Sequence, residues 1–282
     1  MRPIKYTILG LAAAVIACGV FSPSRGTNSA LPIGTSAPST ERAATGNEAT
    51  TPPETGGLPE EAILILTPGN GSRLVGRVHV EGVADSTFEQ TLALQLVAFY
   101  EGVERVLAEQ PVLIQAELGQ RGLFAADVVF TNEAATEQPG EVRVIAVSPR
   151  DGGRTHLATA QVTLAASGPE DIRAAEPHAE LILITAPAPA GTISGGVAHV
   201  EGIGLASFEQ TLVVEVYDAD GQLLGRAPTI VSAPDYGVHG PFTADVSYSV
   251  SSAGPGRIVV LDPSPAFGQT LHLASVEIRI EP

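Results

Sequence analysis

One stretch of sequence occurs twice in this chain. His-Val-Glu-Gly stands at 79–82 and again at 199–202, and Phe-Glu-Gln-Thr-Leu stands at 88–92 and again at 208–212. Both second copies follow the first at the same interval, and the gap between the two blocks is unchanged. Chance does not place so many matching residues at one spacing, so the 282-residue chain contains the same domain twice. This division suits the ordinary size of protein domains.

The composition limits what these domains can be built from and what they can bind. Hydrophobic residues make up 44% of the chain, which supports real cores. Aromatic residues make up only 5% and Trp is absent, so we expect cores of Val, Leu, Ile and Ala. The formal net charge is −16, and no basic stripe exists. This charge repels phosphate, which opposes nucleic-acid binding and direct adhesion of the domains to an anionic lipid surface.

The N-terminus has the features of a secretion signal and a membrane anchor. Arg2 and Lys5 precede an apolar run over 8–17, which is too short to span about 30 Å of hydrocarbon as a helix. The run ends Val-Ile-Ala-Cys, which resembles the bacterial lipobox, and Cys18 is the only cysteine of the chain. This resemblance implies that 1–17 is a lipoprotein signal peptide and that Cys18 carries the lipid that anchors the protein to a membrane. The alternatives are an ordinary signal peptide with an incidental cysteine, or an uncleaved short anchor.

Residues 18–61 are predicted to be a disordered linker behind the lipidated cysteine. Of the 42 residues at 19–60, 24 are Pro, Ser, Thr or Gly. Such a segment has too few bulky side chains to bury a core, so it stays disordered. As a random coil it would hold the first domain about 35 Å from the membrane.

Two all-β domains are predicted, over 62–167 and 179–282, with a linker over 168–178. In both, apolar or alternating runs are separated by turn residues, and no helical period of useful length occurs. The runs are 63–66, 78–81, 92–96, 124–130, 142–147 and 157–164 in the first copy, and 181–184, 213–217, 222–224 and 240–246 in the second. Roughly seven strands in about 105 residues is the size of an immunoglobulin-like β-sandwich.

The order of motifs within each copy is also distinctive. An apolar strand leads to a Pro/Gly turn, then a strand ending Val-x-Gly, then Phe-Glu, and later Gly-x-Phe. These motifs stand at Pro68, 80–82, 88–89 and 122–124, and again at Pro187, 200–202, 208–209 and 240–242. The order resembles the immunoglobulin-like domain of bacterial sporulation and spore-germination envelope proteins. The first copy departs from it at 99–102, which lacks the Asp of the Asp-x-x-Gly turn at 218–221. The resemblance implies a structural domain with no catalytic residues and a link to germination.

The repeated histidines are candidate metal ligands. His79 and Glu81 lie two residues apart on one predicted strand and share a face, as do His199 and Glu201. Because Val80 supplies the core face, we expect both pairs to be solvated. A metal site would need further ligands from neighbouring strands.

Two acidic motifs are predicted to be structural. Glu89 and Glu209 follow Phe88 and Phe208, and we expect each carboxylate to accept backbone N–H bonds at a strand corner while the Phe anchors the core. Ligand recognition is the alternative. The sequence Asp-Ala-Asp-Gly at 218–221 looks like the start of a calcium loop but lacks the later acidic ligand, so a hairpin turn is expected.

We predict a protein with no catalytic residues, no cofactor and no metal. The sequence contains no Gly-x-Ser-x-Gly, no recurring Ser/His/Asp spacing and no phosphate-binding glycine motif. An anchored tandem of β-sandwiches is typical of proteins that bind or display, so we predict an extracytoplasmic, non-catalytic lipoprotein. Its two immunoglobulin-like domains would bind an envelope protein or a cell-wall glycan. The alternatives are an extracytoplasmic hydrolase, a solute-binding lipoprotein or a passive surface stalk.

Overall fold

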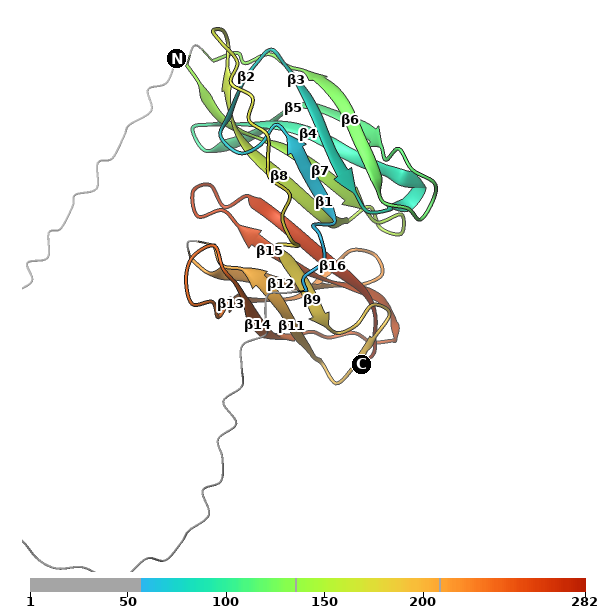
Figure 1. Cartoon of the computed structure of the whole chain (residues 1–282). Helices are drawn as coiled ribbons and strands as arrows, with labels where there is room; N and C mark the ends of the chain where they lie inside the picture. Colours follow the sequence, from blue (N-terminus) through green and yellow to red (C-terminus); the bar gives the residue numbers. More distant parts are fainter. Residues whose placement is uncertain (1–56, 135, 208) are drawn as a thin grey trace, which may run out of the picture. The chain divides into compact units, whose positions relative to one another are not determined.

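The computed structural model describes residues 57–134, 136–207 and 209–282, and they form strands joined by turns (Figure 1). The all-β prediction of two immunoglobulin-like sandwiches is confirmed. The predicted signal peptide, the predicted lipidation site Cys18, the predicted disordered linker up to residue 56 and Phe208 lie outside the described residues. Within the described part of the chain, no helix has the length and apolar character needed to cross a membrane.

The first repeat is a sandwich of two antiparallel sheets. Its strands are β1 (Ile63–Thr67), β2 (Ser72–Val75), β3 (Arg77–Ala84), β4 (Thr91–Tyr100), β5 (Val103–Leu113), β6 (Gly122–Val129), β7 (Gln138–Val147) and β8 (Arg154–Ala165). One sheet has the order β1-β3-β6 and the other β5-β4-β7-β8, with β2 pairing in parallel with the end of β8. Alternate residues such as Val78 and Val80 on β3 point into the core between the sheets, because side chains alternate along a strand.

The second repeat has the same plan. Its strands are β9 (Ile182–Ala186), β10 (Thr192–Ile193), β11 (Val197–Leu205), β12 (Thr211–Tyr217), β13 (Leu223–Ile230), β14 (His239–Ser247), β15 (Gly254–Pro263) and β16 (Thr270–Ile280). The sheet β9-β11-β14 faces the sheet β13-β12-β15-β16, and β10 pairs in parallel with the end of β16. The correspondence of β1–β8 with β9–β16 gives the internal repeat its structural meaning.

The two repeated motifs contact each other in both sandwiches. The glycine that ends Val-x-Gly, Gly82 on β3, lies directly opposite Phe124 of the Gly-x-Phe motif on β6. Gly202 and Phe242 are paired in the same way on β11 and β14. The ring of each Phe covers its glycine so closely that a Cβ there would overlap both the ring and a neighbouring backbone carbonyl oxygen. The glycines recur because the buried aromatic ring occupies the space of a side chain.

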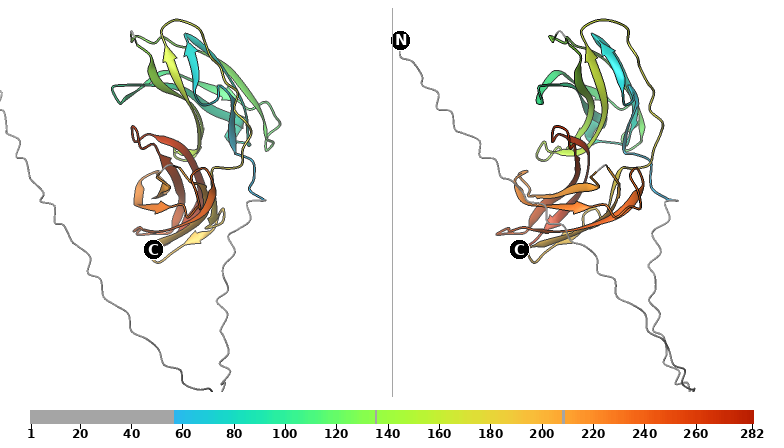
Figure 2. Two further views of the ribbon diagram at one scale, coloured as in Figure 1. Left: turned by 60° about the vertical axis from the view of Figure 1, so that its left-hand side comes forward. Right: turned by 90° about the vertical axis from the view of Figure 1, so that its left-hand side faces the viewer.

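The repeats are joined through their edge strands. Leu157 on β8 pairs with Leu273 on β16, and His156 pairs with Ala274. An unbroken path of eight strands therefore runs β5-β4-β7-β8-β16-β15-β12-β13, and Figures 1 and 2 show β8 beside β16. Pairing two edges removes the unpaired backbone groups that each would otherwise present.

A small hydrophobic cluster is buried at this junction. It contains side chains from the outward faces of both four-stranded sheets: Ile145, Leu157, Val213, Val259, Leu261 and Leu273. The polar contacts around it are reciprocal. Thr159 Oγ1 donates a 2.7 Å hydrogen bond to the Leu271 carbonyl, and Ser275 Oγ donates a 2.8 Å bond to the Thr155 carbonyl. Equivalent surfaces of the two repeats therefore meet, and each supplies the contact that the other receives.

The predicted disordered linker ends earlier in the structure than the sequence suggested. Glu60 forms a β-bridge with Ala179, and the Glu61 side chain is 1% exposed. The prediction that disorder extends to residue 61 was wrong, because composition does not reveal that Glu61 has polar partners in the second repeat.

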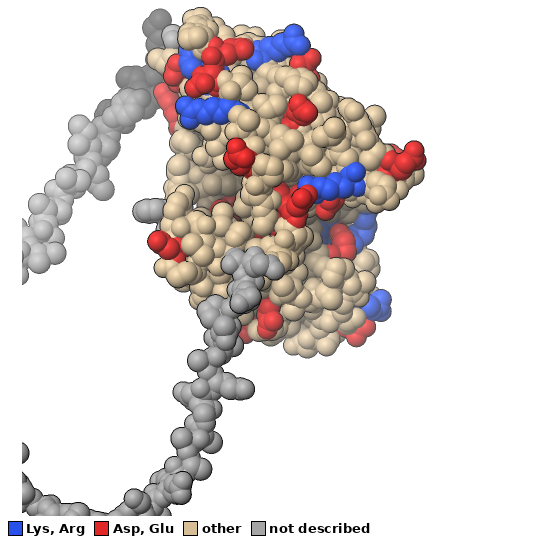
Figure 3. All heavy atoms as spheres, viewed as in Figure 1, with Lys and Arg blue, Asp and Glu red and all other residues tan. Residues whose placement is uncertain are grey.

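The described surface carries acidic and basic side chains close together. Residues other than Asp, Glu, Lys and Arg cover most of the face drawn in Figure 3.

Candidate functional site

The repeated histidines lie on the surface, as the sequence predicted. The side chain of His79 is 55% exposed, and its Nδ1 lies 3.1 Å from Asp127 Oδ1. The side chain of His199 is 59% exposed and lies between Asp245, at 2.7 Å, and Glu201, at 3.0 Å. Only the second copy forms the expected His–Glu pair.

The role assigned to Phe88 was wrong. Phe88 is 60% exposed, whereas Gln90, two residues later, is 5% exposed. Gln90 Nε2 donates to the carbonyls of Glu117 and Gln120, so the glutamine anchors the corner. Glu89 and Glu209 are exposed, and among the described residues no backbone N–H donates a hydrogen bond to either carboxylate. The chain turns sharply here, at a φ of 54° for both Glu89 and Gln90, and the turn directs the Phe outward.

The acidic motif at 218–221 forms the predicted turn between β12 and β13. Asp218 Oδ1 accepts the N–H groups of Asp220 and Gln222 at 2.9 and 2.8 Å. Gly221 has a φ of 76°, a left-handed conformation that favours glycine. These contacts occupy the Asp218 carboxylate within its own turn.

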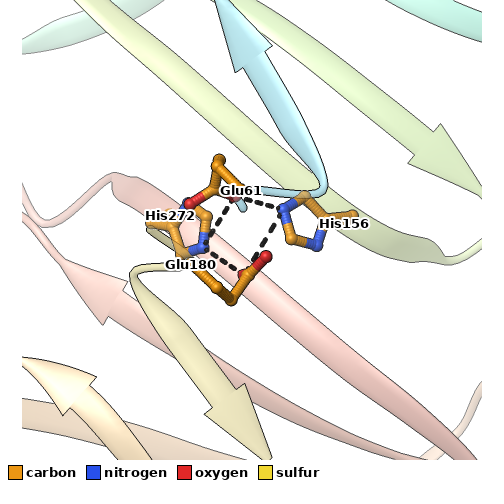
Figure 4. Close-up of side chains that lie close together, drawn as sticks. All are labelled: Glu61, His156, Glu180 and His272. Atoms are coloured by element: carbon orange, nitrogen blue, oxygen red, sulfur yellow. Dashed lines mark hydrogen bonds and ion pairs between the residues drawn. The ribbon is translucent and has the colours of Figure 1, made fainter. Parts of the chain in front are cut away.

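A different group of polar residues meets at the junction of the repeats (Figure 4). Glu61 lies two residues before β1, and Glu180 lies two residues before β9. His156 lies on β8 and His272 lies on β16. Among the described residues, these four form the one group of three or more His, Cys, Asp or Glu whose ligand atoms could surround an ion, with all atoms within 4.8 Å of one another.

The four side chains point toward a common centre. His156 Nε2 lies 2.8 Å from Glu61 Oε1 and 3.8 Å from Glu180 Oε1. His272 Nε2 lies 3.6 Å from Glu61 Oε1 and 3.4 Å from Glu180 Oε1. Each imidazole therefore faces both carboxylates, and each repeat supplies one His and one Glu.

The other oxygen of each carboxylate is held by the opposite repeat. Glu61 Oε2 accepts the N–H of Leu181 at 3.0 Å, and Glu180 Oε2 accepts the N–H of Ala62 at 2.9 Å. Each glutamate thus receives a hydrogen bond from the residue that follows its counterpart. These backbone donors fix both carboxylates so that their Oε1 atoms face the two histidines.

The cluster is buried, and burial changes its protonation. The side chains of Glu61, Glu180, His272 and His156 are 1%, 7%, 4% and 12% exposed. Burial raises the pKa of the Glu180 carboxyl, against the lowering effect of the His156 charge. Burial also lowers the pKa of His272 to about 3, although the Glu61 carboxylate opposes this change. A low-dielectric site disfavours charge on a group that lacks full compensation.

Sequence reasoning missed this cluster, although a weak signal was present. The tripeptide His-Leu-Ala occurs at 156–158 and again at 272–274, and both first strands are preceded by Glu at 61 and 180. The His-Leu-Ala repeat stands at a different interval from the longer motifs, so it is easily overlooked. No spacing rule brings together two residues before a strand and two within distant strands.

A second buried polar contact joins the repeats nearby. Arg257 Nη2 of β15 lies 2.9 Å from Asp151 Oδ2 in the β7–β8 turn, with side chains 3% and 1% exposed. Burial acts to raise the pKa of Asp151, but hydrogen bonds from the Gly153 N–H, Arg257 and Ser148 and the Arg257 charge outweigh it and lower this pKa to about 2. On the other side of the junction, Phe267 stacks on Phe99 with ring centroids 5.1 Å apart.

Asp151→Asn is expected to destabilise the protein by about 3 kcal/mol at pH 7. It removes the buried carboxylate partner of Arg257 and leaves only the partly exposed Glu277, at 3.4 Å. The folded-state pKa of Asp151 is depressed, so its contribution is present above the unfolded-state pKa of about 3.9 and is lost as the pH falls toward 2. Urea unfolding at pH 7 and pH 3 should show the difference between wild type and variant shrinking at the lower pH. Asp220→Asn, at an exposed aspartate of the β12–β13 turn, is the control. An equal difference at both pH values would contradict this account.

Comparison with known proteins agrees with the fold. The family model for the immunoglobulin-like domain of bacterial spore germination (Gmad2) matches residues 62–153 and, a second time, residues 181–269. A search of curated proteins finds no match. The two matched segments contain the glycine and phenylalanine motifs of each repeat. They end just before β8 and β16, so His156 and His272 lie a few residues beyond them. The chain therefore belongs to the family of immunoglobulin-like domains of bacterial spore germination, and it carries that domain twice.

Proposed function

We propose that this protein is a non-catalytic, extracytoplasmic lipoprotein that binds an envelope protein through its two immunoglobulin-like domains. Cys18 would hold it at the membrane through its lipid. Family membership supports a place in the envelope and a link to spore germination. The lipobox-like sequence before Cys18 supports the anchor.

One observation carries the binding role: each repeat exposes apolar side chains at the same place. We call these side chains the rim patches, Leu113, Leu118 and Leu123 in the first repeat and Ile230, Tyr236 and Pro241 in the second. In both repeats they lie at the end of one strand, in the following connection, and at the start of the next strand. The backbone is equivalent as well, since Gln115 donates to the Leu123 carbonyl and Ser232 to the Pro241 carbonyl.

The exposure of the rim patches is high. Leu113, Leu118 and Leu123 are 62%, 77% and 50% exposed, and Ile230 and Tyr236 are 65% and 68% exposed. In the second repeat, Ile230 and Pro241 line a cavity of about 750 Å³ together with Leu183, Ile203 and Val231. Grouped apolar side chains on a surface typically mark a protein interaction site. A glycan would require mainly polar partners, so the patches favour a protein.

The presence of two patches bears on affinity. When two sites on one chain engage one partner or one assembly, the second contact forms at a high effective concentration and strengthens binding. A passive stalk needs no such surface in either copy. The duplication therefore fits a bivalent binding protein better than a spacer.

The test is crosslinking in cells followed by capture of the full-length lipoprotein. We expect an envelope protein to be recovered with wild type, and its recovery to fall about tenfold or more with Leu113→Glu combined with Ile230→Glu. Val129→Glu, at a side chain that is 73% exposed at the other end of β6, is the control. Cys18→Ser should lose the lipid and move to the aqueous phase on detergent partitioning.

Four outcomes would count against the proposal. Equal recovery of the partner with the double variant and with Val129→Glu would exclude the rim patches. Sedimentation of the protein with purified cell wall, and no captured protein, would favour a glycan ligand. If an unrelated sandwich in place of the second repeat preserved the cellular phenotype, the protein would be a stalk. A Cys18→Ser protein that still labelled with palmitate would refute the anchor.

A further inference from the structure

We propose that Glu61, His156, Glu180 and His272 bind a single Zn²⁺ ion that joins the two repeats. This site goes beyond the proposed binding function and does not depend on it. All four ligands would be protein atoms, so the site would be structural and not catalytic.

The four His–Glu distances suit a four-coordinate site of the size that Zn²⁺ prefers. Zn²⁺ binds imidazole nitrogen and carboxylate oxygen at about 2.0–2.2 Å, and a tetrahedron of that size has edges of about 3.4 Å. The four His–Glu edges measure 2.8, 3.4, 3.6 and 3.8 Å. They bracket this value, and all four atoms lie within 4.8 Å of one another, so movement of the side chains toward the centre would complete a tetrahedral site.

Two of the four atoms have no hydrogen-bond partner among the described residues. They are His272 Nε2 and Glu180 Oε1, both buried and both facing the centre of the cluster. A buried polar atom without a partner is costly and uncommon in folded proteins. One ion at the centre would satisfy both atoms together with Glu61 Oε1 and His156 Nε2.

The surroundings are those of a metal site. Each carboxylate has one oxygen held by a backbone N–H and the other directed at the centre. Carboxylates that bind a metal are typically oriented by such an additional hydrogen bond. Two buried carboxylates carry a charge of −2 when ionised, which one divalent cation neutralises. Two nitrogen and two oxygen ligands suit Zn²⁺, whereas Mg²⁺ and Ca²⁺ require six or more oxygens.

The ion has a route to the site. A cavity of about 460 Å³ reaches the cluster and is lined by Glu61, His272 and His178, among others. His178 is 42% exposed, and its Nδ1 lies 3.8 Å from Glu61 Oε2. This histidine stands where an ion would pass from solvent to the buried ligands.

The ligands come in equal number from each repeat, so the complete site exists only when the repeats are in contact. Binding an ion that recognises the joined state but not the separated state stabilises the joined state. The metal would therefore stabilise the contact between the two domains.

The test uses the full chain in detergent, stripped with a chelator and then given Zn²⁺ alone. We expect one Zn²⁺ per chain after dialysis and a rise in Tm of about 8 °C at a hundredfold excess over Kd. Co²⁺ in its place should give the strong visible absorption of a tetrahedral ion. His272→Gln and Glu61→Gln should abolish retention and the Tm rise, whereas His199→Gln and Glu201→Gln, an exposed pair of the same residue types, should keep both.

Glu61→Gln keeps the test valid if other variants unfold. Its amide oxygen can still accept the Leu181 N–H, so the metal-free Tm should stay close to that of wild type while the response to Zn²⁺ disappears. The proposal is overturned by a wild-type chain that retains no Zn²⁺. It is equally overturned if Glu61→Gln and His272→Gln respond to Zn²⁺ like wild type, or if Co²⁺ gives the pale spectrum of an octahedral ion.

Discussion

Leu157→Asp is expected to uncouple the two repeats and to lower the free energy of unfolding by about 4 kcal/mol. Leu157 is 0% exposed and lies opposite Leu273 where β8 meets β16. The substitution deletes a buried leucine and places a carboxylate among Ile145, Val213 and Val259, which supply no hydrogen bond. The side chain lies outside the first repeat's own core, so each sandwich should still fold.

Calorimetry of the full chain measures this effect. Wild type should show one main transition, because the repeats share a sheet and a buried cluster, and Leu157→Asp should show two. Leu123→Asp is the matched control, since Leu123 lies on a strand of the same repeat and is 50% exposed. A single transition at the wild-type temperature in Leu157→Asp would show that the junction adds little stability.

Gly82→Ala is expected to destabilise the first repeat by about 3 kcal/mol, at the upper end of the usual cost of overpacking a core. The new methyl group would overlap the Leu64 carbonyl oxygen and the Phe124 ring. Neither can move freely, because Leu64 is paired with β3 and Phe124 is 0% exposed. Gly202→Ala should have the same effect on the second repeat through Leu183 and Phe242.

Chemical unfolding of each variant gives the measurement. Gly254→Ala is the control, because a Cβ at Gly254 meets nothing within 4 Å. Adding Phe124→Leu to Gly82→Ala should recover part of the lost stability by making room for the methyl group. If Gly82→Ala were as stable as Gly254→Ala, close packing of Phe124 would not be the reason for the repeated glycine.

Much of the fold could be predicted from the sequence because each strand and turn has a pattern in its own neighbouring residues. Alternating apolar residues, as on β3, indicate strands with one buried face, and turn residues separate them. Strand β5 was not predicted, and its burial explains why. It is the outer strand of its sheet and most of its side chains are at least partly exposed, so its sequence lacks the alternation that core contact imposes.

The site could not be predicted in the same way. The longest repeated motifs drew attention to His79 and His199, which are exposed, and to Phe88, which points outward. Those motifs recur because of the requirements of each sandwich, as Gly82 and Phe124 show. The Glu and His residues of the junction serve a contact between the two sandwiches. Such a contact leaves no periodic pattern in the sequence of any strand.

The amino-acid pattern alone was enough to establish two copies of one all-β domain, since repetition and strand alternation are properties of neighbouring residues. It was also enough to suggest a lipid anchor at Cys18, which stays a prediction. The pairing of β8 with β16, and with it the meeting of Glu61, His156, Glu180 and His272, emerged from the folded structure. Such contacts depend on which faces of two finished domains are complementary, and that complementarity comes from residues distant in the chain.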